Sequence, residues 1–209
     1  MRYRVHFSKT EEMRYTSHLD LQRTWERTIR RAGLPLSYSQ GFNPRPKINL
    51  GFALPLGITS ECELLDIWLD QELADEDVAQ ALVDSAPPGI KVKDVSLVDL
   101  KSPKLPTLID SACYRVTLLK ETPNLGKRIN ELMISETLIR ERRGKTYDLR
   151  PLLNRIEAMS KNQKGQGRLE MCLRSKPGET GRPDEVLLAL GIDPFSTLIH
   201  RTEIILTSP

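Results

Sequence analysis

A run of arginines early in the chain has the spacing and the chemistry of a phosphate-binding surface. Arg23, Arg27 and Arg30 recur at intervals of four and three residues, which places them on one stripe if this segment is helical. Guanidinium groups match phosphate oxygens with pairs of hydrogen bonds. The stripe is therefore a candidate surface for a phosphate-bearing partner. Alternatively, its arginines pair with Glu26 and the acidic segment 61–77, or they form a solvated helix face.

The segment after this stripe adds polar groups that could share the same ligand. Residues 34–46 are rich in Pro, Ser, Asn and Gly, which is typical of a loop. Gly41 allows the backbone to approach a ligand closely. Because a residue that precedes a proline avoids the helical region, Arg45 is expected to be extended. The loop contributes these candidates to the nucleic-acid-binding surface: Gln40, Asn43, Arg45 and Lys47.

His18, near the expected start of the same helix, supports a catalytic hypothesis. A metal-independent RNA endonuclease would place His18 and Lys47 around a scissile phosphate. The alternative is that His18 joins the helix start to the loop by hydrogen bonds. The sequence contains no carboxylate pair, Ser/His/Asp order or glycine-rich phosphate loop of known spacing. A non-catalytic role is therefore favoured, and enzymatic activity stays an open question.

A second basic segment surrounds residue 144. Residues 138–142 and 145–149 are expected to form a hairpin about Gly144. Cations on such a hairpin could lie along a phosphate backbone and add affinity without sequence preference. Equally, they could keep a solvated sheet edge from pairing with another chain. The candidates in this hairpin are Arg140, Arg142, Arg143 and Lys145.

Charge is distributed unevenly along the 209 residues, although the net charge is only +3. Residues 1–50 hold ten Lys and Arg against four Asp and Glu, whereas residues 51–100 hold two against eleven. Residues 101–150 are basic again, with eleven against six. This segregation predicts one surface for an anion and another that faces away from it.

The cysteines and the apolar residues exclude several classes of protein. Cys62, Cys113 and Cys172 are far apart and form no CxxC pair, so no zinc site, iron–sulfur cluster or other cofactor is expected. A reducing, cytoplasmic location follows, and a chain of this length needs no disulfide to stabilise its core. No apolar run approaches the ~20 residues of a membrane span. The first ten residues do not resemble a signal peptide.

Periodic patterns predict the elements that would position the first group of candidates. Ser17 and Asp20 have the spacing of a capping box at a helix start, and Gly33 is expected to end that helix. Strands are expected at residues 2–8, 47–53, 61–69 and 90–98, with helices at 17–32 and 75–85. The order βαββαβ predicts a ferredoxin-like lobe over residues 1–100.

A second lobe is expected after a linker. Residues 101–110 include Pro103 and Pro106 and are expected to connect the lobes. Residues 111–209 are expected to form a second ferredoxin-like lobe, elaborated by the extra hairpin about Gly144. Its strands are expected at 112–119, 156–159, 168–173 and 198–206, with helices beginning near Leu125 and at Pro183. The predicted fold class is α+β, with two ferredoxin-like lobes.

Several motifs resemble a known family. The helix start SHLD, the helix end RRAGLP and the loop SQGFNPRPK, all within residues 17–69, strongly resemble the radical-SAM-associated proteins of unknown function. The segment GRPDEVLLALG at residues 181–191 is similar to the C-terminal helix of that family. The resemblance implies a radical SAM protein as partner, because such domains occur alone or fused behind one. It implies no reaction.

The first hypothesis for function combines the residues with this resemblance. It is a non-catalytic adaptor that binds a phosphate-rich partner, structured RNA, and presents it to a radical SAM enzyme. The second is a metal-independent RNA endonuclease, since paired ferredoxin-like lobes also resemble the RNA-processing RAMP proteins of CRISPR systems. That resemblance exists only at the level of fold, which does not confer function. The third is an adaptor that binds protein alone, through the acidic face of residues 61–77 or an apolar sheet face.

Overall fold

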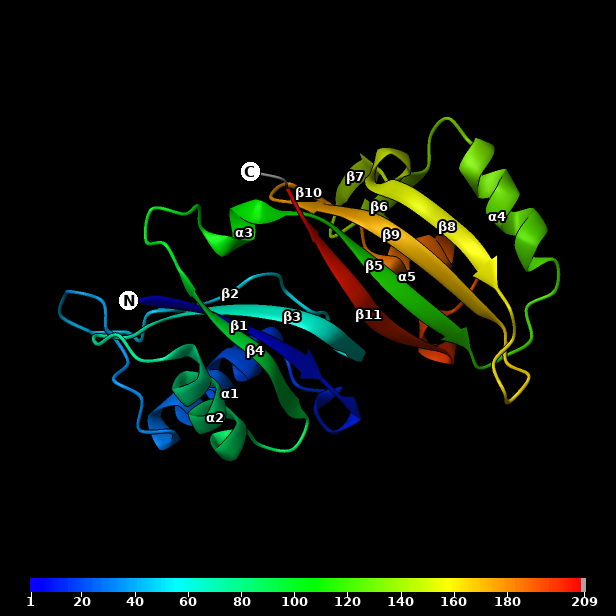
Figure 1. Cartoon of the computed structure of the whole chain (residues 1–209). Helices are drawn as coiled ribbons and strands as arrows, with labels where there is room; N and C mark the ends of the chain where they lie inside the picture. The colour runs from blue at the N-terminus through cyan, green and yellow to red at the C-terminus, as the bar shows by residue number, and fades with distance from the viewer. Residues whose placement is uncertain (208–209) are drawn as a thin grey trace. The chain divides into compact units, whose positions relative to one another are not determined.

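The computed structural model describes residues 1–207 and divides into two compact units (Figure 1). Unit 1 is Met1–Leu108, and unit 2 begins at Ile109. The segment expected to connect two lobes, residues 101–110, contains a short helix, α3 (Leu105–Leu108), and the first residues of strand β5. Each unit has its own strands and its own helices, so helices and antiparallel strands are mixed throughout the chain, as the sequence predicts.

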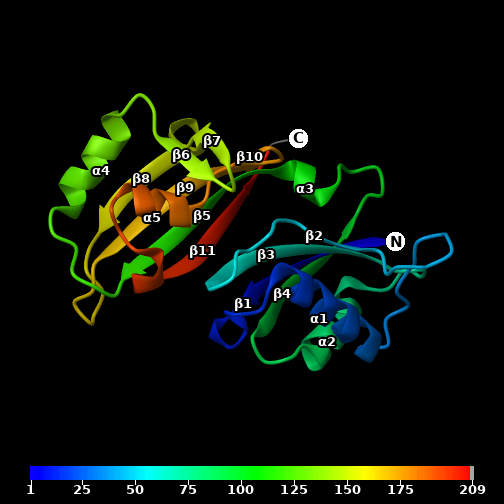
Figure 2. The same cartoon turned by 180° about the vertical axis from the view of Figure 1, so that it is seen from behind.

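Unit 1 is a four-stranded antiparallel sheet with two main helices. In chain order its elements are β1 (Arg2–Lys9), α1 (His18–Arg31), β2 (Ile48–Leu50), β3 (Ile58–Trp68), α2 (Asp75–Ser85) and β4 (Ile90–Val98). The strand order is β2–β3–β1–β4, and all neighbours are antiparallel. Both helices lie on the same face of this sheet (Figures 1 and 2).

The core of unit 1 lies between that face and the helices. Alternation along β1 directs Tyr3, Val5 and Phe7 toward the helices, and all three are fully buried. The indole of Trp25, on α1, meets the ring of Phe7 edge to face, with centroids 4.8 Å apart. Leu21 and Ile29 lie one turn before and after Trp25 and are also buried. The buried stripe of α1 therefore fixes which side of the helix faces solvent.

A buried ion-pair cluster occupies the opposite face of the sheet. Asp66 of β3 is fully buried, and its carboxylate accepts hydrogen bonds from Arg2 Nε at 2.9 Å and Arg4 Nε at 2.8 Å. The guanidinium of Arg2 also donates to the backbone carbonyls of Ser102 and Pro103, each at 2.9 Å. One carboxylate thus pairs with two guanidinium groups, and the guanidinium of Arg2 anchors the chain that follows β4.

His6 makes the stability of unit 1 depend on pH. This residue lies opposite Asp94 of β4, and burial lowers the pKa of its imidazole below 6.5 despite the opposing effect of Asp94. The other charges that act on it are those of Arg4, Asp66 and Lys93. Because the folded state binds this proton more weakly than the unfolded chain, the contribution of His6 to stability is complete above pH 6.5. It is lost as the pH falls below that value toward the lower folded-state pKa.

We therefore expect the urea concentration at the unfolding midpoint of unit 1 to decrease as the pH is lowered from about 7.5 to about 5.5, the range in which histidine titrates. The variant His6→Gln, which carries no titrating group at this position, should show a smaller fall. Tryptophan fluorescence measures the midpoint, because both tryptophans, Trp25 and Trp68, lie in unit 1. Equal falls in the two proteins would contradict the role of His6.

Unit 2 repeats the strand order of unit 1 and adds a hairpin. Its elements are β5 (Ile109–Leu118), α4 (Leu125–Ile134), β6 (Ile139–Arg142), β7 (Lys145–Asp148), β8 (Leu153–Met159), β9 (Arg168–Lys176), β10 (Glu179–Thr180), α5 (Pro183–Ala189) and β11 (Thr197–Leu206). The order is β8–β9–β5–β11, with β10 also against β9. Strands β6 and β7 form the separate hairpin predicted about Gly144, and α5 packs across one face of the sheet (Figure 2).

A disulfide bond in unit 2 was not foreseen from the sequence. Cys113 of β5 lies directly opposite Cys172 of β9, and the two are bonded, with Cα atoms 4.0 Å apart and both side chains buried. The expectation of reduced cysteines was wrong for this pair. Fifty-nine residues separate them, so only the register of β5 against β9 brings them together. Within residues 1–207, Cys62 is not part of a disulfide bond.

None of the helices within residues 1–207 is both long enough and apolar enough to cross a lipid bilayer.

Candidate nucleic-acid interface

Helix α1 begins at the predicted cap and exposes the predicted arginine stripe. The Ser17 hydroxyl accepts a hydrogen bond from the Asp20 backbone N–H at 3.2 Å and donates to the Asp20 carboxylate at 2.7 Å. The buried side of α1 holds Leu21, Trp25 and Ile29. Three arginines follow the opposite side of the helix: Arg23, Arg27 and Arg30.

The loop of residues 37–47 is closed by hydrogen bonds between its two arms. The Lys47 N–H donates to the Ser37 carbonyl at 2.8 Å, and the Ser39 N–H donates to the Arg45 carbonyl at 2.8 Å. The Arg45 N–H donates in turn to the Ser39 hydroxyl at 2.9 Å. The backbone of Arg45 is therefore fixed at both its N–H and its carbonyl, while its side chain is exposed to solvent.

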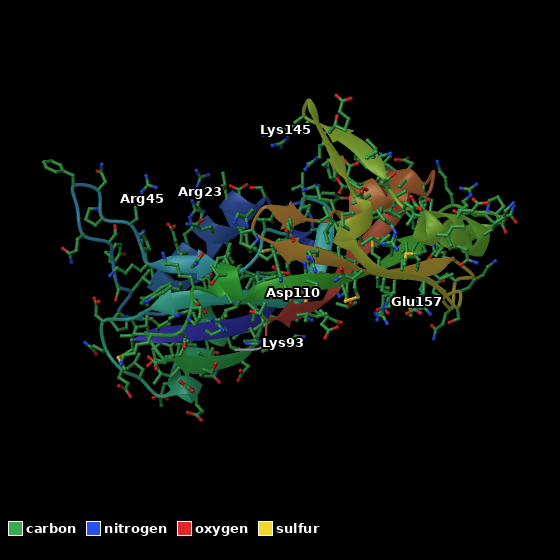
Figure 3. The ribbon with its side chains drawn as sticks, turned by 90° about the horizontal axis from the view of Figure 1, so that it is seen from above. Arg23, Arg45, Lys93, Asp110, Lys145 and Glu157 are labelled. Atoms are coloured by element: carbon green, nitrogen blue, oxygen red, sulfur yellow. A yellow bond between two sulfur atoms is a disulfide. The ribbon has the colours of Figure 1, made fainter. Side chains whose placement is uncertain are left out.

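Helix and loop converge at two places. A cavity of about 420 Å³ lies between them, lined by Leu19, Gln22, Arg23, Glu26, Arg45 and Pro46. Figure 3 shows Arg23 and Arg45 extending from the same side of unit 1. Further along the helix, Arg30 Nε donates to the Tyr38 hydroxyl at 3.2 Å, and its guanidinium lies 5.9 Å from the centre of the Tyr38 ring. The arginine stripe and the loop thus form one continuous surface.

The positive charge of this surface is only partly neutralised. Arg23 meets Asp20 at 3.4 Å, but both side chains are more than half exposed, and such a pair contributes about 0–1 kcal/mol. Within residues 1–207 the side chains of Arg27, Arg45 and Lys47 have no ion-pair partner. Glu26 lines the cavity beside the two guanidinium groups. The cavity therefore combines two cations, one carboxylate and one amide.

The tip of the loop presents an aromatic ring that sequence reasoning missed. Phe42 is fully exposed, between Gly41 and Asn43. Gln40 and Asn43, the two amide candidates, lie on either side of it in the chain. The sequence signal was an aromatic residue in a Gly-, Asn- and Pro-rich loop too short to bury it. An exposed ring of this kind can stack on an unpaired base.

The two residues of the catalytic hypothesis, His18 and Lys47, lie outside the cavity formed by α1 and the loop. His18 is the first residue of α1 and is half-buried, whereas Lys47 is exposed directly before β2. Neither residue lines the cavity between Arg23 and Arg45. Within residues 1–207 no three His, Cys, Asp or Glu side chains cluster so as to hold a metal ion. RNA cleavage by His18 and Lys47 stays a hypothesis.

Two of the four cations in the basic hairpin of unit 2 form ion pairs, and the other two are exposed. Arg140 Nε and Arg142 Nε lie 3.2 and 3.9 Å from the carboxylate of Glu185, a buried residue of α5. These two arginines therefore attach the hairpin to α5. Arg143 and Lys145 flank the turn, are exposed and have no ion-pair partner in the described part of the chain. Of the four, these two are available to an external anion.

Comparison with known proteins gives a family and distant structural neighbours. The profile of a family described as uncharacterised proteins conserved in bacteria (DUF2344) matches residues 2–183. No curated protein matches the chain. Among solved structures, a chain of a Cbf5–Nop10–Gar1 complex is similar with a TM-score of 0.49 and 10% identity, over 97% of this chain and 48% of that one. A chain of an archaeal box H/ACA sRNP Nop10–Cbf5 complex gives 0.46 and 11%, over 97% and 48%. The chain spans about half the length of these structures.

Proposed function

The chain belongs to this family of uncharacterised bacterial proteins, which brings no activity with it, and from the surface of unit 1 we propose a non-catalytic adaptor that binds structured RNA. The observation that carries the proposal is the convergence of Arg23, from α1, and Arg45, from the loop, on one cavity. Exposed guanidinium groups carried by a helix and by a loop with a hydrogen-bonded backbone suit the phosphates of a nucleic-acid backbone.

The remaining groups of this surface suit a nucleotide better than a simple anion. Glu26 in the cavity would repel an isolated phosphate, but a carboxylate can accept hydrogen bonds from the amino group of cytosine. Phe42 supplies a stacking surface for a base, and the amides of Gln40 and Asn43 can bond to base edges. Because a base must be unpaired to stack on a loop tip, the proposed ligand is RNA with loops or bulges.

The fold proposed with this function is a pair of ferredoxin-like lobes. If the four main strands of each unit are numbered in chain order, both sheets have the order second–third–first–fourth. In both units a helix follows the first of these strands and another follows the third. This arrangement supports the ferredoxin-like assignment of both lobes.

A radical SAM protein is the proposed partner, and its support is the resemblance of the SHLD, RRAGLP and SQGFNPRPK segments. The adaptor would act in the cytoplasm. Affinity purification from native cells tests the partnership: a radical SAM protein should be recovered together with RNA. Its recovery after nuclease treatment would show direct protein contact, and its absence from all preparations would remove it from the proposal.

The RNA proposal is tested with the double variant Arg23→Gln/Arg45→Gln. Affinity for a labelled RNA hairpin, measured by fluorescence anisotropy, should fall about ten- to a hundred-fold for each of the two contacts that is lost, since a hydrogen bond to a charged group contributes about 1.5–3 kcal/mol. The slope of log affinity against log salt should also decrease by about 0.7–0.9 for each phosphate that the variant no longer neutralises.

The matched control is Lys91→Gln/Lys93→Gln, which removes the same charge from exposed positions of β4. Lys93 lies on the other side of unit 1 from Arg23 and Arg45 (Figure 3). The control should keep most of its affinity. If both double variants lose affinity equally, the binding depends only on net charge, and the assignment of the RNA site to Arg23 and Arg45 is rejected. If neither does, the RNA proposal is rejected in favour of an adaptor for protein.

A further inference from the structure

The turn between β8 and β9 in unit 2 is flanked by two depressions. One, of about 570 Å³, lies against Thr117 and Leu198 of the neighbouring strands. The other, of about 470 Å³, extends toward Lys120, which follows β5, and Leu125, the first residue of α4. The depressions share Lys161, Gln166 and Arg168 in their linings. Both are therefore built around the same loop, residues 160–167.

Hydrogen bonds within the loop give it a defined shape. The Asn162 side-chain oxygen accepts from the N–H groups of Lys164 and Gln166, at 3.0 and 2.9 Å. The Asn162 amide nitrogen donates to the side-chain oxygen of Gln166 at 2.8 Å. Arg168 Nε holds the base of the loop by donating to the Ser160 carbonyl at 2.9 Å. The lysines thus project from an ordered frame, which lowers the entropic cost of binding.

The charge around the loop is strongly positive and unpaired. The two linings together contain four cations and a single carboxylate, that of Glu121. The cations are Lys120, Lys161, Lys164 and Arg168. Within residues 1–207 none of the three lysines has an ion-pair partner. An electrostatic preference for anions follows, without internal ion pairs that would have to be broken first.

We infer that this loop and Lys120 form a phosphate-binding site for the backbone of a single-stranded nucleic acid. Two depressions on either side of one loop suit a chain of phosphates better than one small ion. Their linings contain no aromatic side chain to stack on a base, so the contact is expected to be independent of sequence. The choice of a nucleic acid as ligand rests on the function proposed for unit 1, whereas the site itself is independent of Arg23 and Arg45.

The test is the full chain with Lys161→Gln/Lys164→Gln, which leaves the structural contact of Arg168 intact. The probe is a fluorescein-labelled RNA single strand of mixed sequence, titrated at several salt concentrations. A phosphate contact on single strands contributes about 0.7 to the slope of log affinity against log salt, so the removal of two should lower the slope by about 1.4. The control Lys101→Gln/Lys104→Gln, at exposed positions of unit 1, should change it much less.

A DNA strand of the same sequence serves as second probe, because a phosphodiester contact does not require the 2′-hydroxyl. A reduced slope on both probes supports the site even if the Arg23→Gln/Arg45→Gln variant leaves RNA binding unchanged, so the two proposals fail separately. An unchanged slope on both probes overturns the inference. Calorimetric binding of pyrophosphate that Lys161→Gln/Lys164→Gln abolishes, with unchanged slopes, would also overturn it and assign the site to a small phosphate ligand.

Discussion

Replacement of Asp66 by alanine is expected to lower the free energy of unfolding of unit 1 by about 3–5 kcal/mol, because removal of one partner leaves buried charge without compensation. The carboxylate is fully buried between Arg2 and Arg4, whose side chains are 3% and 12% exposed. The carbonyls of Ser102 and Pro103 bind Arg2 but cannot neutralise it. A loss of this size is a large part of the roughly 5–15 kcal/mol that is typical of a whole domain.

Urea unfolding followed by tryptophan fluorescence measures this loss in unit 1 alone, since Trp25 and Trp68 are the two tryptophans of the chain. The control Asp84→Ala removes an exposed carboxylate at the end of α2 and should change the free energy by no more than about 0.5 kcal/mol. If the two substitutions have similar effects, the ion-pair cluster does not contribute as its burial suggests.

The second large effect is expected from Trp25→Ala, with a loss of about 3–5 kcal/mol in the free energy of unfolding. The indole is fully buried, and its contact with Phe7 joins α1 to the centre of the sheet. Alanine would leave a cavity under the helix that carries Arg23, so RNA affinity should fall together with stability. The fluorescence of Trp68 and circular dichroism measure the unfolding of this variant.

A companion variant, Trp25→Phe, separates the aromatic contact from the size of the side chain. The buried Nε1 of Trp25 has no hydrogen-bond partner in the described part of the chain, so phenylalanine gives up no hydrogen bond and keeps an aromatic contact with Phe7. We expect it to cost less than half as much free energy as alanine. Equal losses for Phe and Ala would show that the size of the indole, and not the presence of an aromatic ring, holds α1 in place.

Local patterns were sufficient to predict most elements of the fold. The cap at Ser17, the alternation in β1 and the proline at the first position of α5 depend on nearest neighbours in sequence, and the structure confirms each of them. Strand β2 is an exception: it was expected at residues 47–53 but is limited to Ile48–Leu50, where it pairs with β3. Conversely, β3 begins at Ile58, earlier than residue 61. The residues at which a strand begins and ends depend on the strand it pairs with, and a single sequence does not show that pairing.

In the candidate site, too, some side-chain positions follow from the local sequence, whereas others depend on contacts between residues far apart in the chain. The position of Arg23, Arg27 and Arg30 on the side of α1 away from its buried stripe follows from helical spacing alone. The binding of Arg140 and Arg142 by Glu185 depends on how the hairpin meets α5, more than forty residues along the chain. Phe42 was overlooked because a hydrophobic residue is first assigned to the core, whereas its loop leaves it in solvent.

The bond between Cys113 and Cys172 has a topological consequence. It closes a covalent ring that contains α4, the β6–β7 hairpin, β8 and the basic turn of residues 160–167. Chain-entropy arguments assign about 4 kcal/mol of stabilisation to a ring of this length. A protease that makes one cut in an exposed turn inside the ring releases no fragment, because both pieces stay joined through sulfur. The nicked protein should therefore migrate as a single species until a reductant is added.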